Sequence, residues 1–187
     1  NIKIKILKPD TKKIMEALEE PKKNEKPLAY TQRVAMNKAI KAMQTIELKK
    51  KPVFPILTAD TTVSFKNKIL GKPISKQDAF LNLMKLSNSC HKVITSVVLV
   101  DLNNKKKIRN KMNIQQFTQV STVWFGEISS SWLENYVLSG EPMDKSGGYG
   151  IQGKGQEIIK KINGSYSGIM GLPLFETNEM LTNYYKQ

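Results

Sequence analysis

The chain has 187 residues, 40% of them hydrophobic and 25% charged, so its composition excludes a disordered polypeptide and supports one domain over residues 1–187. A single cysteine excludes a disulfide framework and a cysteine-rich zinc site. No apolar run approaches the roughly 20 residues that cross a bilayer, and no secretory leader is seen, so we expect a cytoplasmic protein without a membrane partner. Because the first residue is Asn1 and not Met, we expect the domain to be N-terminally incomplete.

The formal net charge of +14 is carried almost entirely by lysine. Arg33 and Arg109 are the two arginines, and the other 28 basic residues are lysines. Sequence-specific nucleic-acid binding favours the bidentate guanidinium group, whereas lysine provides a point charge that suits phosphate. The charge therefore does not favour nucleic acid as a partner, and it leaves small polyphosphates open.

The first half of the chain predicts strands and helices in alternation. Residues 1–9 alternate between apolar and polar positions, as in a strand. Apolar residues at helical spacing predict an amphipathic helix over 30–48. Residues 55–73 predict a strand, a polar turn at Lys66 and Asn67, and a short second strand. A helix over 75–87 begins with a capping box formed by Ser75 and Asp78.

The second half continues this alternation. Residues 92–125 predict two strands joined by a long basic connection, and 129–140 predict a capped helix that ends at Gly140. A glycine-rich segment, 144–155, precedes residues 156–170, where Asn163 and Gly164 predict a hairpin turn. A last helix begins near Pro173. The pattern predicts an α/β fold, in which a mixed sheet carries helices packed against it.

Cys90 and His91 are adjacent, which raises the hypothesis of a cysteine–histidine nucleophile. Residues 90–100 are typical of a strand, however, and successive side chains of a strand point to opposite faces. We therefore expect a packed cysteine and a structural histidine with its hydrogen bonds satisfied.

Asp60 stands between apolar residues in the predicted strand 55–65. A buried carboxylate needs a cationic partner or a metal, so its alternatives are a structural salt bridge and a functional acid. Lys72 follows the turn, and the hairpin could return it beside Asp60, although most lysines are simply exposed. Phosphoanhydride hydrolysis needs these two groups, a carboxylate and cations that neutralise phosphate charge. The glycine-rich segment 144–155 is either a mobile surface loop or a main chain that closely approaches a ligand.

Five blocks in order resemble the Maf family of nucleoside triphosphate pyrophosphatases, from about residue 29 to 182. They are "ADTTV", "ILGKP", "LMKLSNSCHKVITSV", "YVLSGEPMDKSGGYGIQGKG" and "INGSYSGIMGLPL". The resemblance implies an elongated fold with a central cleft, similar to inosine triphosphate pyrophosphatases. It also implies cleavage between the α and β phosphates with a divalent cation, Mg²⁺ or Mn²⁺, and a homodimer among the potential assemblies.

By resemblance, Asp60 is the proton acceptor and a metal contact, and Lys38 and Lys72 bind phosphate. Thr61 and Gln152 fall at base-selecting positions. The block around Gln152 resembles the branch that acts on dTTP and UTP, whereas the branch that prefers 7-methyl-GTP has a glutamate there. The amide of Gln152 can both donate and accept, and can therefore pair with a pyrimidine carbonyl and imide N–H. This implies an enzyme that removes unwanted or modified pyrimidine nucleotides.

The chain departs from the family pattern at three places. No Ser-x-Ser-Pro-Arg-Arg loop precedes the first predicted strand, Lys13 takes the position of a glutamate near the metal, and Gly126 stands where an arginine is common. These departures keep open a catalytically impaired nucleotide- or nucleic-acid-binding protein. A 7-methyl-GTP pyrophosphatase is the other alternative, and Gln152 disfavours it.

Overall fold

The computed structural model describes residues 4–8, 12–50, 54–101 and 113–186 of the chain. Its larger elements are α1 (Lys12–Leu18), α2 (Pro27–Leu48), β1 (Ile56–Phe65), β2 (Lys68–Leu70), α3 (Lys76–Leu86), β3 (Cys90–Asp101), β4 (Asn113–Phe125), α4 (Ser130–Leu138), β5 (Ile159–Asn163), α5 (Tyr166–Ile169) and α6 (Leu174–Tyr185). Three short 3₁₀ helices, η1 (Glu141–Asp144), η2 (Ser146–Gly148) and η3 (Lys154–Ile158), lie between α4 and β5.

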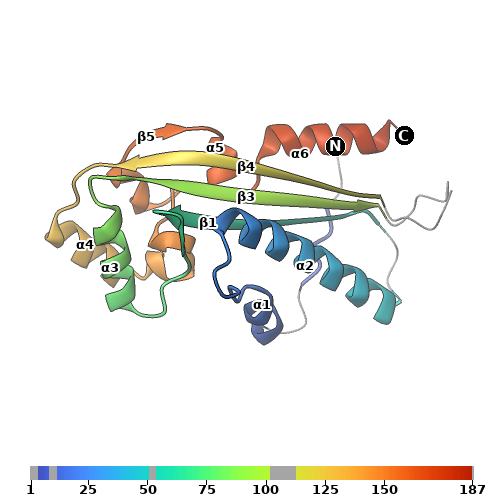
Figure 1. Cartoon of the computed structure of the whole chain (residues 1–187), viewed down its shortest axis with the longest axis horizontal. Helices are drawn as coiled ribbons and strands as arrows, with labels where there is room; N and C mark the ends of the chain where they lie inside the picture. Colours follow the sequence, from blue (N-terminus) through green and yellow to red (C-terminus); the bar gives the residue numbers. More distant parts are fainter. Residues whose placement is uncertain (1–3, 9–11, 51–53, 102–112, 187) are drawn as a thin grey trace.

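The five strands form one sheet in the order β2-β1-β3-β4-β5. The long strands β1, β3 and β4 give the molecule its elongated form, and helices flank the sheet (Figure 1). This confirms the expected α/β fold. The expected mixed sheet proves to be antiparallel in every pairing that the structure describes. The reason is that the connections from β1 to β3 and from β4 to β5 leave and re-enter the sheet at the same end, which reverses the strand direction.

β3 is buried on both faces along most of its length, which explains the continuous apolar run over residues 97–100. Val98 and Val100 pack against α2, whereas Val97 and Leu99 pack against Met180 of α6. Alternate side chains of a strand point to opposite faces, so a strand covered by helices on both sides needs apolar residues at every position. The sheet thus forms the central layer between α2 and α6 (Figure 1).

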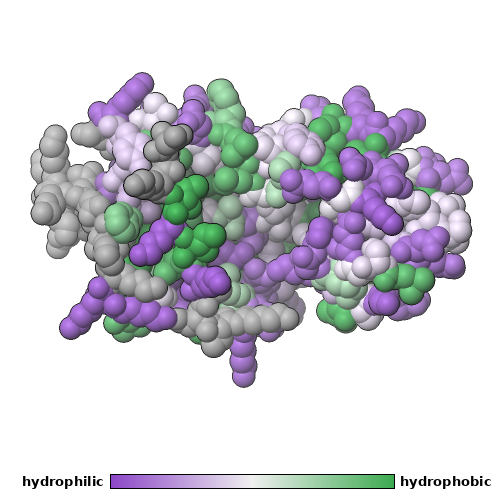
Figure 2. Space-filling model, turned by 180° about the vertical axis from the view of Figure 1, so that it is seen from behind, coloured by the Kyte–Doolittle hydropathy of each residue, from purple (hydrophilic) through white to green (hydrophobic). Residues whose placement is uncertain are grey.

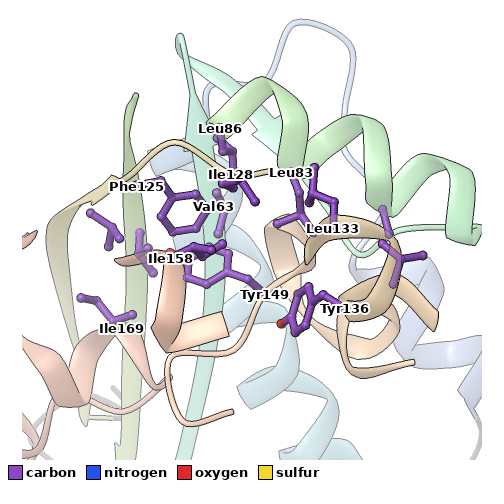
Figure 3. Close-up of a cluster of buried hydrophobic side chains, with 14 residues drawn as sticks. Val63, Leu83, Leu86, Phe125, Ile128, Leu133, Tyr136, Tyr149, Ile158 and Ile169 are labelled. Carbon is purple, nitrogen blue, oxygen red and sulfur yellow. The ribbon is translucent and has the colours of Figure 1, made fainter. Parts of the chain in front are cut away.

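A separate apolar cluster joins one end of the sheet to α3, α4 and the glycine-rich segment (Figure 3). Its buried members include Val63, Leu83, Leu86, Phe125, Leu133, Tyr136 and Tyr149. Tyr149 belongs to the glycine-rich segment, and its ring meets that of Phe125 edge to face at a centroid distance of 4.7 Å. The segment is therefore anchored in the core, and the alternative of a mobile surface loop is wrong at this residue.

Local hydrogen bonds confirm several predicted boundaries. Ser75 accepts from the backbone N–H of Asp78 at 3.1 Å and begins α3. Lys66 and Asn67 have φ angles of +48° and +61°, as in a tight hairpin turn between β1 and β2. Gly140 adopts the left-handed conformation, with φ of +78°, just after α4.

Two local predictions are wrong. Residues 4–8, the described interior of the strand expected over 1–9, form no strand. Gly164 does not form a hairpin turn, because the following residue, Ser165, caps α5 by accepting from the N–H of Gly168 at 3.0 Å. A Cβ at Gly164 would lie 2.5 Å from Oγ of Ser121, so glycine is needed there for close approach to β4.

Cys90 and His91 point to opposite faces of β3, as predicted, and so do not form a catalytic pair. Cys90 is exposed, which corrects the expectation of a packed cysteine. His91 is 3% exposed, and its Nε2 lies 2.7 Å from the hydroxyl of Tyr149. Its Nδ1 has no partner among the described residues, so the expected satisfaction of its hydrogen bonds is partial.

Burial lowers the pKa of His91 from 6.5 to about 4, which makes the stability of the fold sensitive to acid. Between pH 6.5 and 4 the unfolded chain binds a proton that the folded chain does not, so stability is complete above pH 6.5 and falls by up to about 3 kcal/mol towards pH 4. We expect the urea midpoint to fall from pH 7 to pH 5 by more in the wild type than in His91→Gln. An equal fall in both proteins would contradict this assignment.

Among the described residues, no helix has the length and apolar character of a membrane span. Seen from behind, the surface is mainly hydrophilic and carries several separate hydrophobic patches (Figure 2).

Candidate active site

A cavity of about 880 Å³ opens beside the middle of β1. Its walls come from the loop after α1, from α2, β1 and β2, from the glycine-rich segment, and from the end of α5. The volume lies within the range that accommodates a ligand the size of a nucleotide. All five residues singled out from the sequence line this one cavity, namely Lys38, Asp60, Thr61, Lys72 and Gln152.

The cavity reaches both faces of the sheet because one edge of β1 is incompletely paired. β2 pairs with Val63–Phe65, and among the described residues no strand pairs with the outer edge of β1 at 59–62. Asp60 therefore meets the cavity from the face covered by α2, and Thr61 meets it from the opposite face. On that opposite face Thr61 shares a 2.9 Å hydrogen bond with Thr95, which donates to the carbonyl of Gly168.

Asp60 and Lys38 form a largely buried ion pair. Nζ of Lys38 lies 2.7 Å from Oδ1 of Asp60, and the two side chains are 17% and 8% exposed, respectively. Burial raises the pKa of Asp60 above its ordinary value, and the attraction of Lys38 offsets only part of this effect. Burial opposes the charge on Lys38, yet Asp60 and Glu19 together raise its pKa. The pair thus combines a charged lysine with an unusually basic carboxylate.

Glu19 is a charged cavity residue that sequence reasoning missed. Its carboxylate lies 2.8 Å from Nζ of Lys38 and 2.9 Å from Nζ of Lys72, so it bridges the two predicted phosphate lysines. Burial opposes its ionisation, but the hydrogen bonds from the two lysines lower its pKa overall. Glu19 is 41 positions before Asp60, and no spacing rule links such distant carboxylates, although the acidic "EALEE" stretch was visible in the sequence.

The backbone around Glu19 is held by α2. Tyr30 donates from its hydroxyl to the carbonyl of Glu19 at 2.6 Å, and Arg33 donates to the carbonyls of Leu18 and Glu20. Lys13, which the resemblance placed at the acidic position near the metal, is exposed on α1 and does not line the cavity. Glu19, six positions later, does line the cavity and places a carboxylate beside Lys38 and Lys72.

Lys72 reaches the cavity by a different contact from the one expected. The turn does return it towards Asp60, but its hydrogen-bonded partner is Glu19. The charge of Lys72 nevertheless acts on Asp60, because its attraction offsets a small part of the rise in pKa that burial causes there. Its side chain is 54% exposed, so it is accessible to a ligand that enters from solvent.

The glycines of the 144–155 segment lie close to side chains of the protein itself. A Cβ at Gly153 would overlap the carboxylate of Glu141, and a Cβ at Gly150 would lie 2.7 Å from Cε of Lys145. Gly147 has φ of +72° and contacts Val63 too closely for a side chain. The glycines chiefly make room for side chains of the protein itself, and close approach to a base is not required to explain them.

The carboxylates fit a divalent cation that also binds phosphate. Asp60 and Glu19 both line the cavity, and the described part of the chain holds no group of three or more histidine, cysteine or acidic residues that would form a complete metal cage. Mg²⁺ is commonly held by one or two carboxylates together with substrate phosphates and water. This donor set suits such a shared site.

Gly126, where the resemblance expected an arginine, lies away from these residues. It lines a second cavity of about 340 Å³ near the start of α4. None of the residues predicted for phosphate or base binding lines that second cavity.

The chain is similar to curated bacterial proteins over most of its length. It is 42% identical to a protein named dTTP/UTP pyrophosphatase from Dechloromonas aromatica over 163 residues, which are 87% of this chain and 77% of that protein. It is 42% identical over 180 residues to a protein of the same name from Cupriavidus pinatubonensis, covering 96% and 86% of the two chains. A third, from Albidiferax ferrireducens, is 38% identical over 183 residues, covering 98% and 87%.

The profile of Maf-like proteins matches residues 1–184. Together with these relatives, the match shows that the chain belongs to the Maf family.

Proposed function

We propose that this protein is a nucleoside triphosphate pyrophosphatase that hydrolyses dTTP and UTP to the monophosphate and pyrophosphate. The observation that carries the proposal is the convergence of Asp60, Lys38, Lys72 and Gln152 on one cavity. The names of the relatives support the substrate class. Modified pyrimidine triphosphates belong to the same class, because the cavity would read their shared base edge.

In this proposal Asp60 accepts the proton of the attacking water. A general base works best when its pKa approaches the working pH, and burial raises the pKa of Asp60 in that direction. Lys38 keeps the carboxylate oriented through its 2.7 Å contact. The proton passes to Asp60 as the water oxygen attacks the α-phosphorus. The bond from the α-phosphorus to the oxygen of the leaving pyrophosphate then breaks.

Lys38 and Lys72 bind the phosphates. Without substrate the two ammonium groups share the carboxylate of Glu19. A triphosphate brings more negative charge than one carboxylate, so it competes for both lysines and stabilises the charge that spreads over the phosphate oxygens. The carboxylate of Glu19 would then be free to hold a divalent cation.

Asp60 and Glu19 are the residues that would hold Mg²⁺ or Mn²⁺. Such a cation, when bound, neutralises phosphate charge and polarises the phosphoryl oxygens. Thr61 and Gln152 select the base from the other side of the cavity. The Gln152 amide can donate to a pyrimidine carbonyl and accept from the imide N–H.

The test is the identity of the product. Incubation with dTTP or UTP and Mg²⁺ or Mn²⁺ should release pyrophosphate and one equivalent of monophosphate, and purine triphosphates should be poorer substrates. Release of orthophosphate alone would overturn the proposal. Preferred turnover of 7-methyl-GTP would overturn the pyrimidine assignment, and nucleotide binding without turnover would identify an impaired binding protein.

We also predict a homodimer, to be measured by light scattering, and a cytoplasmic location, where the nucleoside triphosphate pool lies.

A further inference from the structure

Glu141 lies next to the glycine-rich segment and accepts three hydrogen bonds. The hydroxyl of Tyr136 donates to its Oε1 at 2.9 Å, the backbone N–H of Lys154 donates to Oε2 at 3.0 Å, and that of Gly155 donates to Oε1 at 3.3 Å. Glu141 is the first residue of η1 and does not line the large cavity. Its contacts therefore act on the main chain near the cavity and not on a ligand.

These contacts hold the main chain on both sides of Gln152. On the C-terminal side, Lys154 and Gly155 donate to Glu141. On the N-terminal side, Gly150 donates from its N–H to the hydroxyl of Tyr136 at 3.2 Å, and that hydroxyl donates to Glu141. The two residues thus form one hydrogen-bonded support for the segment 150–155, and Gln152 is at its middle.

The close packing of this support depends on the glycines. A side chain at Gly153 would overlap the Glu141 carboxylate. A Cβ at Gly155 would lie 2.7 Å from the carbonyl oxygen of Gly150 and 3.0 Å from the Tyr136 hydroxyl. The sequence of the segment is therefore matched to the carboxylate beside it.

The three donors require an ionised carboxylate at this position. A carboxylate presents acceptors on both oxygens, whereas the amide of a glutamine presents one acceptor oxygen and one donor group. Burial opposes ionisation of Glu141, but the N–H of Lys154 and the other donors lower its pKa overall. In a glutamine at this position, the side-chain NH₂ group would face at least one of the three groups that donate to Glu141, and that hydrogen bond would be lost.

We propose that Glu141 is the positioning residue for base selection, because it fixes the backbone on both sides of Gln152 so that the amide is presented to the cavity in one orientation. The inference rests on the proposed function, since Gln152 is the proposed base-reading residue. Asp60 and Lys38 lie on β1 and α2, outside this support, so the chemical step should be largely insensitive to Glu141.

The test is Glu141→Gln, with Glu134→Gln on the exposed side of α4 as the matched control. Losing one well-placed hydrogen bond is worth roughly tenfold in affinity. We therefore expect KM for dTTP to rise about tenfold, the preference for dTTP over dGTP to fall about tenfold, and kcat to change less than about threefold. Glu134→Gln should behave as the wild type.

Tyr136→Phe provides a second variant, which removes the hydroxyl and keeps the ring. If both residues act through the same segment, the double variant should lose no more selectivity than Glu141→Gln alone. If Glu141→Gln lowers thermal stability but leaves the ratio of kcat/KM for dTTP to kcat/KM for dGTP unchanged, the role of Glu141 is purely structural and the inference is overturned.

Dissociation constants for non-hydrolysable analogues of dTTP and dGTP, measured by calorimetry, separate this inference from the proposed function. These dissociation constants report base selection whether or not the protein hydrolyses its substrate. A wild type that releases no pyrophosphate would overturn the proposed function. Equal selectivity of wild type and Glu141→Gln for the two analogues would overturn the role of Glu141.

Discussion

Replacing Asp60 with asparagine is expected to lower kcat for dTTP by roughly 10²- to 10⁴-fold, the contribution typical of a general base. The amide keeps the size of the side chain but cannot accept a proton at neutral pH. Since Asp60 is proposed to act in the transition state, kcat and kcat/KM should fall together. The measurement is pyrophosphate release under saturating and limiting substrate.

Asp78→Asn is the matched control, because this residue lies near the start of α3 and does not line the cavity. Its turnover should match that of the wild type. Turnover of Asp60→Asn within a factor of about two of the wild type would exclude Asp60 as the base.

Replacing Lys38 with methionine is expected to destabilise the fold by about 3 kcal/mol and to abolish most activity. Lys38 is 17% exposed, and its ammonium lies within 3 Å of both Asp60 and Glu19. Its removal leaves the buried carboxylate of Asp60 without its cation, whereas Glu19 keeps Lys72, and an unpaired buried charge costs far more than the net gain of the pair. Urea unfolding at pH 7 measures the stability change.

The double variant Lys38→Met with Asp60→Asn provides the control for this prediction. With the carboxylate of Asp60 also neutralised, much of the lost stability should return, because a buried ion pair replaced by neutral groups of similar size is often close to neutral. Equal stability of the single and double variants would contradict the proposed coupling. Neither variant should regain activity.

The elements were predictable because their signals are local. The helix over 30–48 followed from apolar spacing, and the turn at Lys66 and Asn67 followed from residues that tolerate positive φ. The strand expected at residues 4–8 and the turn at Gly164 were wrong for different reasons. A strand needs a neighbour to pair with, and Asn163–Gly164 is followed by Ser165, whose capping of α5 competes with a hairpin.

The polar residues of the cavity were also accessible from the sequence, since a carboxylate within an apolar strand is conspicuous. Their grouping needed the resemblance as well as the residues. The partner of each charge was not predictable. Lys72 was expected beside Asp60, but its hydrogen-bonded partner is Glu19, and Lys38 takes the place beside Asp60.

By itself, the sequence determined the fold class and most element boundaries, and with the family resemblance it identified five of the residues that line the cavity. The tertiary structure decided which charges meet, that Glu19 bridges two lysines, and that Glu141 supports the segment carrying Gln152. The physical reason is the difference in sequence separation between the residues that interact. Helix and turn preferences act over a few residues, whereas an ion pair between α2 and the loop after α1, or a carboxylate beside a distant main chain, depends on how the elements pack.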